Sequence, residues 1–150
     1  MNRLYKTTLM TLLFLNSLPS FAYDLNTKIG CFKALYTGAN SSSEARQACE
    51  AFLDHKTDIN IYIKTRTGIG CGMNSHYEAM EAATAVQEKR ISGLVYLKSR
   101  FGCGGINSHL EAFSAAEASL KGKIDSECYI ENRRSSQWLL HDEAMEFCKI

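Results

Sequence analysis

Tyrosine, lysine and arginine recur with the same spacing at two places in the 150-residue chain. The two triplets are Tyr62, Lys64 and Arg66, and Tyr96, Lys98 and Arg100. Residues two apart on a β-strand share a face, so each triplet would point one way. Aromatic and arginine side chains dominate many binding surfaces. Two neighbouring strands would therefore present a face that binds an anionic glycan or an acidic protein; the alternative is a solvated face with ordinary cross-strand pairs.

His76 and His109 also occupy matching places, each directly after a serine. Such histidines could form a metal site, a pH-sensitive contact or the acid–base group of a small hydrolase, although repetition alone explains them. Nucleophilic catalysis needs a serine or cysteine with a histidine and an orienting carboxylate, and no motif assembles them. We therefore expect no catalytic residues, no metal and no cofactor, with a small envelope hydrolase as an alternative.

Two glycine-rich segments, 68–72 and 102–105, follow the triplets. A loop that leads into a helix N-terminus can hold an anion, because its free amides and the helix dipole point outward. The spacing matches neither a nucleotide-binding fingerprint nor a phosphate-binding loop with its lysine. The alternative is a structural loop held by a disulfide.

These features belong to a repeat of about 33–34 residues. The pattern Gly-x-Asn-Ser-x-x-Glu-Ala occurs at 38–45, 72–79 and 105–112. In each copy the Ser-x-x-Glu part predicts a capping box, in which the two side chains satisfy free amides at a helix start. The pairs are Ser41 and Glu44, Ser75 and Glu78, and Ser108 and Glu111. Apolar residues at helical spacing follow each box, so the sequence predicts a capped helix in every copy.

Ile59, Ile61 and Ile63 alternate with polar or amphipathic residues, which is typical of a strand, and residues 94–98 match them. The predicted fold is α/β: a single small domain of three to four repeated β-α units, each a strand, a Gly-rich loop and a Ser-capped helix. The alternative is an all-α helical repeat, like a tetratricopeptide array. An open sheet leaves an unpaired edge, which makes a homodimer possible.

Residues 1–22 resemble a cleaved signal peptide, with Arg3 and Lys6, an apolar run and small residues before Tyr23. Residues 23–150 would form one mature domain, and all six cysteines fall within it. An even number of cysteines in an exported chain predicts three disulfides, with fifteen possible pairings. Their places in the repeats favour Cys31 with Cys49, Cys71 with Cys103, and Cys128 with Cys148.

Charge and hydropathy exclude some classes of partner. The chain has 17 basic and 16 acidic side chains, and loss of Arg3 and Lys6 leaves 15 and 16. Such a balance provides no positive field for nucleic acid. No later segment is apolar enough to span a membrane after the signal is cleaved. We expect a periplasmic or secreted protein whose partner is a protein or a cell-wall glycan.

The segment Tyr36–Ala45 resembles the SPOR repeat, which implies peptidoglycan binding and two strands between helices. In size and export signal the chain is also similar to periplasmic immunity proteins that neutralise secreted cell-wall-degrading toxins. The sequence thus favours an exported non-enzymatic binding protein of the cell envelope, such as an inhibitor or immunity protein. The alternatives are a peptidoglycan- or glycan-binding module and a small envelope hydrolase.

Overall fold

The computed structural model describes residues 23–36, 40–67, 74–100, 107–134 and 139–150. Within these ranges the chain forms eight α-helices and no β-strand, apart from one isolated bridge between Ile124 and Lys149. The helices are α1 (Lys28–Leu35), α2 (Ser42–Leu53), α3 (Ile59–Thr67), α4 (His76–Gln87), α5 (Gly93–Arg100), α6 (His109–Leu120), α7 (Ser126–Arg134) and α8 (His141–Phe147).

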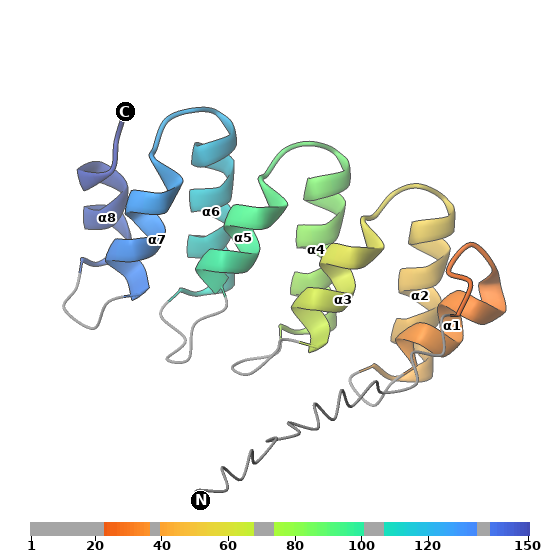
Figure 1. Cartoon of the computed structure of the whole chain (residues 1–150). Coiled ribbons are helices and arrows are strands. Elements are labelled where there is room, and N and C mark those ends of the chain that lie inside the picture. The colour runs from red at the N-terminus through yellow and green to blue at the C-terminus, as the bar shows by residue number, and fades with distance from the viewer. Residues whose placement is uncertain (1–22, 37–39, 68–73, 101–106, 135–138) are drawn as a thin grey trace, which may run out of the picture.

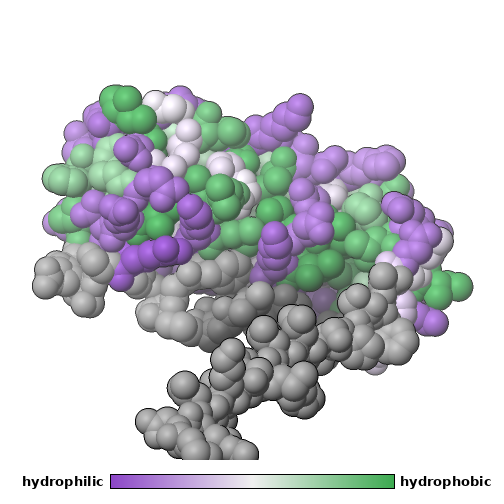
Figure 2. All heavy atoms as spheres, in the orientation of Figure 1, coloured by the Kyte–Doolittle hydropathy of each residue, from purple (hydrophilic) through white to green (hydrophobic). Residues whose placement is uncertain are grey.

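The helices pair into four hairpins that stand in a row, α1 with α2, α3 with α4, α5 with α6, and α7 with α8 (Figure 1). The odd-numbered helices lie along one face of the row and the even-numbered helices along the other (Figure 1). Hydrophobic side chains reach the surface in several places among hydrophilic ones in the same view (Figure 2). Among the described helices the main contacts lie within a hairpin or between neighbouring hairpins, which is the arrangement of a helical solenoid.

The predicted α/β fold is therefore wrong, and the all-α repeat is the architecture observed. Both expected strands are helices, α3 and α5. The SPOR resemblance implies strands that the described residues lack, and a homodimer argued from a sheet edge loses its basis. In α3 the buried positions Ile59, Tyr62 and Arg66 are three and four residues apart, so the helical period fits the buried face. Strand propensity is weak evidence because packing overrides it.

A local signal for these helices was present in the sequence. The Asp58 side chain accepts hydrogen bonds from the backbone amides of Asn60 and Ile61, at 2.9 and 3.1 Å. Asp125 does the same for α7, and the Ser92 hydroxyl accepts from the Val95 amide at 3.4 Å. Asp and Ser are preferred helix N-caps. Their matching places before α3, α5 and α7 mark helix starts.

The three predicted capping boxes are confirmed. Ser41, Ser75 and Ser108 accept from the amides of Glu44, Glu78 and Glu111, and each glutamate accepts from the serine's own amide. The even-numbered helices bury a stripe of small side chains, which lets neighbouring helices approach closely. The buried alanines are Ala45, Ala48, Ala79, Ala82, Ala83, Ala85, Ala112, Ala115, Ala116 and Ala144.

Two disulfides hold the outer hairpins closed. Cys31 of α1 is bonded to Cys49 of α2, and Cys128 of α7 is bonded to Cys148 directly after α8. In the inner hairpins the repeat places Ile61 with Ala83 and Val95 with Ala116 at these positions, all buried. The expected Cys71–Cys103 pair, the signal peptide and both glycine-rich segments lie outside the described residues.

Within the described ranges, no helix is long and apolar enough to cross a membrane.

Candidate functional site

The tyrosines and arginines of the two triplets lie between the hairpins. Tyr62 and Tyr96 have 0% of their surface exposed, and Arg66 is buried. On a helix, residues four apart share a face whereas residues two apart do not. Tyr62 and Arg66 therefore point together, and Lys64 points to solvent instead. The shared face expected from strand geometry is absent here because these segments are helical.

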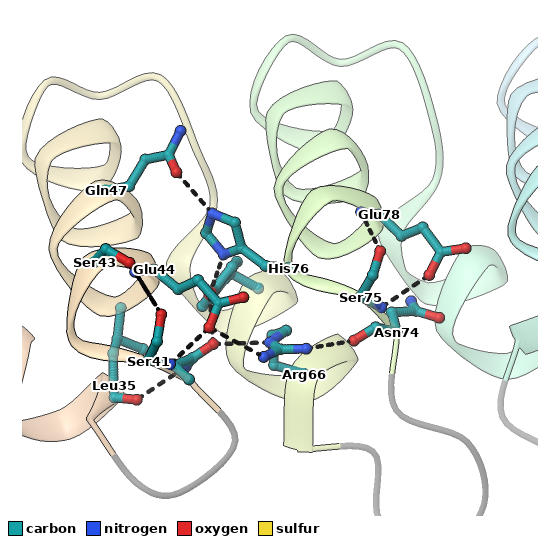
Figure 3. A network of polar contacts seen from close by, with 12 residues as sticks. Leu35, Ser41, Ser43, Glu44, Gln47, Arg66, Asn74, Ser75, His76 and Glu78 are labelled. Carbon is teal, nitrogen blue, oxygen red and sulfur yellow. Dashed lines mark hydrogen bonds and ion pairs between the residues drawn. The ribbon is translucent and has the colours of Figure 1, made fainter.

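The first contact between hairpins is a polar network that joins α2, α3 and α4 (Figure 3). Asn40, just before α2, accepts through Oδ1 from Tyr62 Oη and from Arg66 Nε, both at 2.8 Å. Arg66 Nη1 also donates to the Asn74 carbonyl oxygen at 2.7 Å, and Nη2 lies 3.7 Å from Glu44 Oε2. One arginine of α3 thus connects the starts of α2 and α4.

His76 completes this network at the start of α4. Its Nδ1 lies 2.8 Å from Tyr62 Oη, and its Nε2 lies 2.9 Å from Gln47 Oε1 of α2 (Figure 3). The single hydroxyl proton of Tyr62 is directed to Asn40. With that proton directed to Asn40, a neutral His76 donates through Nδ1 to the tyrosine oxygen, and its Nε2 then accepts from the Gln47 amide after a half-turn of that amide.

The same network recurs where α6, α7 and α8 meet. Asn107 Oδ1 accepts from Arg133 Nε at 2.6 Å and from Tyr129 Oη at 3.3 Å. His141 Nδ1 lies 2.8 Å from Tyr129 Oη, and Arg133 Nη2 lies 3.5 Å from Glu111 Oε1. The residues that recur in the sequence therefore recur as one structural unit.

In the middle contact the asparagine amide is turned over. Asn74 Nδ2 donates to Tyr96 Oη at 2.8 Å, so that hydroxyl is free to donate to His109 Nδ1, also 2.8 Å away. Asn74 Oδ1 and Arg100 Nε are buried and have no hydrogen-bond partner within the described part of the chain. A half-turn of the Asn74 amide would supply its oxygen to Tyr96 and Arg100, as in the other two networks.

Burial keeps the network tyrosines protonated. It raises the pKa of Tyr62 and of Tyr129 to about 12, and it raises the pKa of Tyr96 as well. The pKa of His76 is lowered, chiefly because burial disfavours the imidazolium, although Glu44 opposes the shift. At neutral pH these groups act as hydrogen-bonding partners rather than charges.

We predict that alkaline pH weakens the fold. A group whose pKa is raised on folding stabilises the protein below its unfolded pKa, here about 10, and that stabilisation is lost as pH rises through the folded value. The contribution of these tyrosines to the free energy of unfolding should therefore be level up to about pH 10 and fall between pH 10 and 12. Urea denaturation over this range, with tyrosinate absorbance, measures it. Tyr129→Phe should lessen the fall, Tyr77→Phe should not, and an identical fall in all three proteins would contradict the assignment.

A carboxylate, an imidazole and a hydroxyl line up in the middle network, as a hydrolase would require. His109 lies between Tyr96 Oη and Glu81, whose Oε2 is 3.2 Å from His109 Nε2. Tyr96, however, has 0% of its surface exposed, so a substrate cannot reach its hydroxyl in this conformation. The arrangement is suited to joining α4, α5 and α6. No group of three or more candidate metal ligands occurs among the described side chains.

Surface grooves lie between the even-numbered helices. The groove between α2 and α4 has a volume of about 330 Å³, and a second one between α6 and α8 has about 280 Å³. The first, here called the α2–α4 groove, is lined by Gln47, His76, Tyr77, Met80, Glu81, Thr84 and Arg90. Sequence reasoning missed it, although Tyr77 lies outside the apolar stripe of its own helix, which was an available signal.

The two lysines of the triplets stay at the surface on the odd-numbered helices. Lys64 is exposed, and Lys98 Nζ donates to Glu127 Oε1 of α7 at 2.9 Å. Of the two triplets, these lysines and the half-buried Arg100 are accessible to a partner, whereas the remaining members are buried in the network. In comparisons with known proteins, no family model, no curated sequence and no solved structure matches this chain.

Proposed function

We propose that this chain is an exported, non-enzymatic binding module of the cell envelope and that its ligand is a cell-wall glycan. Solenoids of helical hairpins offer extended surfaces on which ligands bind, while the contacts between repeats maintain the shape. Here the repeated Tyr, Arg, Asn and His side chains are engaged in the contacts between hairpins. Recognition is therefore assigned to side chains that reach the surface rather than to the buried tyrosines, arginines and asparagines.

The observation that carries the proposal is the α2–α4 groove. It brings an exposed tyrosine together with a carboxylate and a hydroxyl of α4, the amide of Gln47 from α2 and the guanidinium of Arg90 from the segment after α4. Small-ligand sites combine apolar surface with a few convergent polar groups in this way. A sugar presents the matching chemistry, an apolar ring face and a rim of hydroxyl groups.

Two disulfides support export to an oxidising compartment, because such bonds persist outside the cytosol. Together with the signal-like residues 1–22 they favour a periplasmic or secreted location. Disulfides also stabilise a small solenoid whose end hairpins have one neighbour each.

The test is co-sedimentation of the oxidised mature protein with purified peptidoglycan sacculi. We expect saturable retention that soluble sacculus digest competes away. Absence of retention at micromolar protein would overturn the proposal.

A second candidate, an inhibitor or immunity protein, is favoured by the face of α3 and α5. Leu94 is 64% exposed, and the repeat places it beside Lys64 in the same way that Glu127 stands beside Lys98. Leu94 stands where Glu127 stands in the next pair of hairpins, so Lys64 faces an exposed leucine there instead of a carboxylate. Such a surface is suited to a protein contact. Capture of one stoichiometric secreted enzyme, abolished by Lys64→Glu with Leu94→Ala, would support this function; capture unaffected by the double variant would exclude this face.

A further inference from the structure

We propose that the α2–α4 groove binds an uncharged, N-acetylated sugar ring, with Tyr77 as the stacking surface and Met80 as the apolar floor. This inference rests on the proposed function and names the site that performs it. The volume of the α2–α4 groove, about 330 Å³, lies at the lower end of the range for small-molecule sites, about 300–1,000 Å³. One or two sugar rings of a longer glycan would fill it.

Tyr77 is the strongest single feature of the groove. It sits in the first turn of α4 and is 77% exposed, although large aromatic side chains usually contribute by burial. An exposed ring at the rim of a groove offers a flat apolar face to the C–H side of a sugar. The thioether of Met80 adapts to irregular apolar shapes and suits the methyl of an acetamido group.

The polar groups around the groove supply both donors and acceptors. Gln47 provides an amide, Glu81 a carboxylate, Thr84 a hydroxyl and Arg90 a guanidinium. Glu81 and Arg90 carry opposite charges, and the lowered pKa of His76 keeps its imidazole neutral at pH 7. The charges of the lining residues thus balance, and Arg90 Nε also pairs with Glu88 Oε2 at 2.6 Å, so no excess positive charge favours a phosphate or another polyanion over a neutral polar ligand.

The repeat places a larger side chain at the same position between the next two even-numbered helices. Between α4 and α6 the position of Met80 is taken by Phe113. Its ring lies 5.8 Å from the His109 ring, and the Arg90 guanidinium carbon lies 5.9 Å from its centroid. In the third groove Met145 again holds this position. We therefore expect the larger side chain to narrow the groove in which it lies.

The test is to fill or strip the α2–α4 groove and measure sugar binding. Met80→Phe copies the native Phe113, and Tyr77→Ala removes the stacking ring from the surface. The matched controls are Met145→Phe, which fills the α6–α8 groove, and Leu110→Ala, which removes the 74%-exposed residue at the place of Tyr77 in α6. The probe is the β-1,4-linked trisaccharide of N-acetylglucosamine, followed by titration calorimetry, with retention on sacculi measured in parallel.

We expect Met80→Phe and Tyr77→Ala to weaken trisaccharide binding and sacculus retention at least about tenfold, which corresponds to about 1.4 kcal/mol. The two controls should bind like the unchanged protein, and circular dichroism should be the same for all. If the wild type is retained on sacculi and both groove variants are retained equally well, the groove is not the binding site, although the proposed function stands. The groove variants could abolish retention while free stem peptide, and not the trisaccharide, competes with the wild type for sacculi. That result would refute the sugar as the ligand of the groove. Absence of wild-type retention would instead refute the proposed function.

Discussion

Replacing Asn107 by alanine is expected to lower the free energy of unfolding by about 3 kcal/mol. The Asn107 side chain is buried, and its Oδ1 accepts from Arg133 Nε at 2.6 Å and from Tyr129 Oη at 3.3 Å. Its Nδ2 donates to the Ser99 carbonyl oxygen at 2.7 Å. The variant leaves a buried charged donor, a hydroxyl and a carbonyl without this partner, and each such loss costs roughly 1–3 kcal/mol.

The loss should be concentrated at one end of the solenoid, because neighbouring hairpins are coupled only through their shared contacts. Urea denaturation measures the total effect, and hydrogen exchange should show α7 and α8 opening before α3 and α4. Asn60→Ala is the matched control, since Asn60 is exposed on α3. A change below about 1 kcal/mol for Asn107→Ala, or equal changes in both variants, would contradict the structural role of the network.

Removing the disulfide of the last hairpin is the second large effect. Cys128→Val with Cys148→Ala copies the native pair Val95 and Ala116, so the packing of an inner hairpin is retained while the covalent link is lost. We expect a loss of about 2–4 kcal/mol, because the cross-link restricts the unfolded chain. Thermal denaturation of the oxidised proteins measures it.

The reverse exchange serves as the complement. Val95→Cys with Ala116→Cys places two cysteines at the positions that Cys128 and Cys148 occupy in their hairpin, so the bond should form and raise stability. If the variant with Cys128→Val and Cys148→Ala were as stable as the wild type, the disulfide would not stabilise the last hairpin, and this prediction would be wrong.

The second helix of each hairpin was predicted from the sequence, and the first was not. Ser75 and Glu78 form a signal that involves only the helix they start, so local chemistry is sufficient. The alternation of Ile59, Ile61 and Ile63 fits a strand and also one wide buried helical face, and only packing against α4 and α5 decides between them. Asp58 before α3 would have favoured the helix.

The site was harder to predict because it depends on distances between repeats. Tyr62 and Arg66 were recognised as recurring, but their partner Asn40 lies 22 and 26 residues away, and nothing local shows that it receives both. Burial then removed these side chains from the surface at which they were expected. The α2–α4 groove is lined by residues of α4, of α2 and of the segment after α4, and recognising it requires the correct helical register.

The most direct test of the central claim is methionine-methyl NMR of the oxidised mature protein during titration with the N-acetylglucosamine trisaccharide. Met80 and Met145 occupy equivalent places in the α2–α4 and α6–α8 grooves, so each serves as a reference for the other. The account predicts a saturable shift of the Met80 methyl resonance that Tyr77→Ala abolishes, with a smaller shift or none at Met145. An unmoved Met80 resonance at trisaccharide concentrations that saturate binding would contradict it.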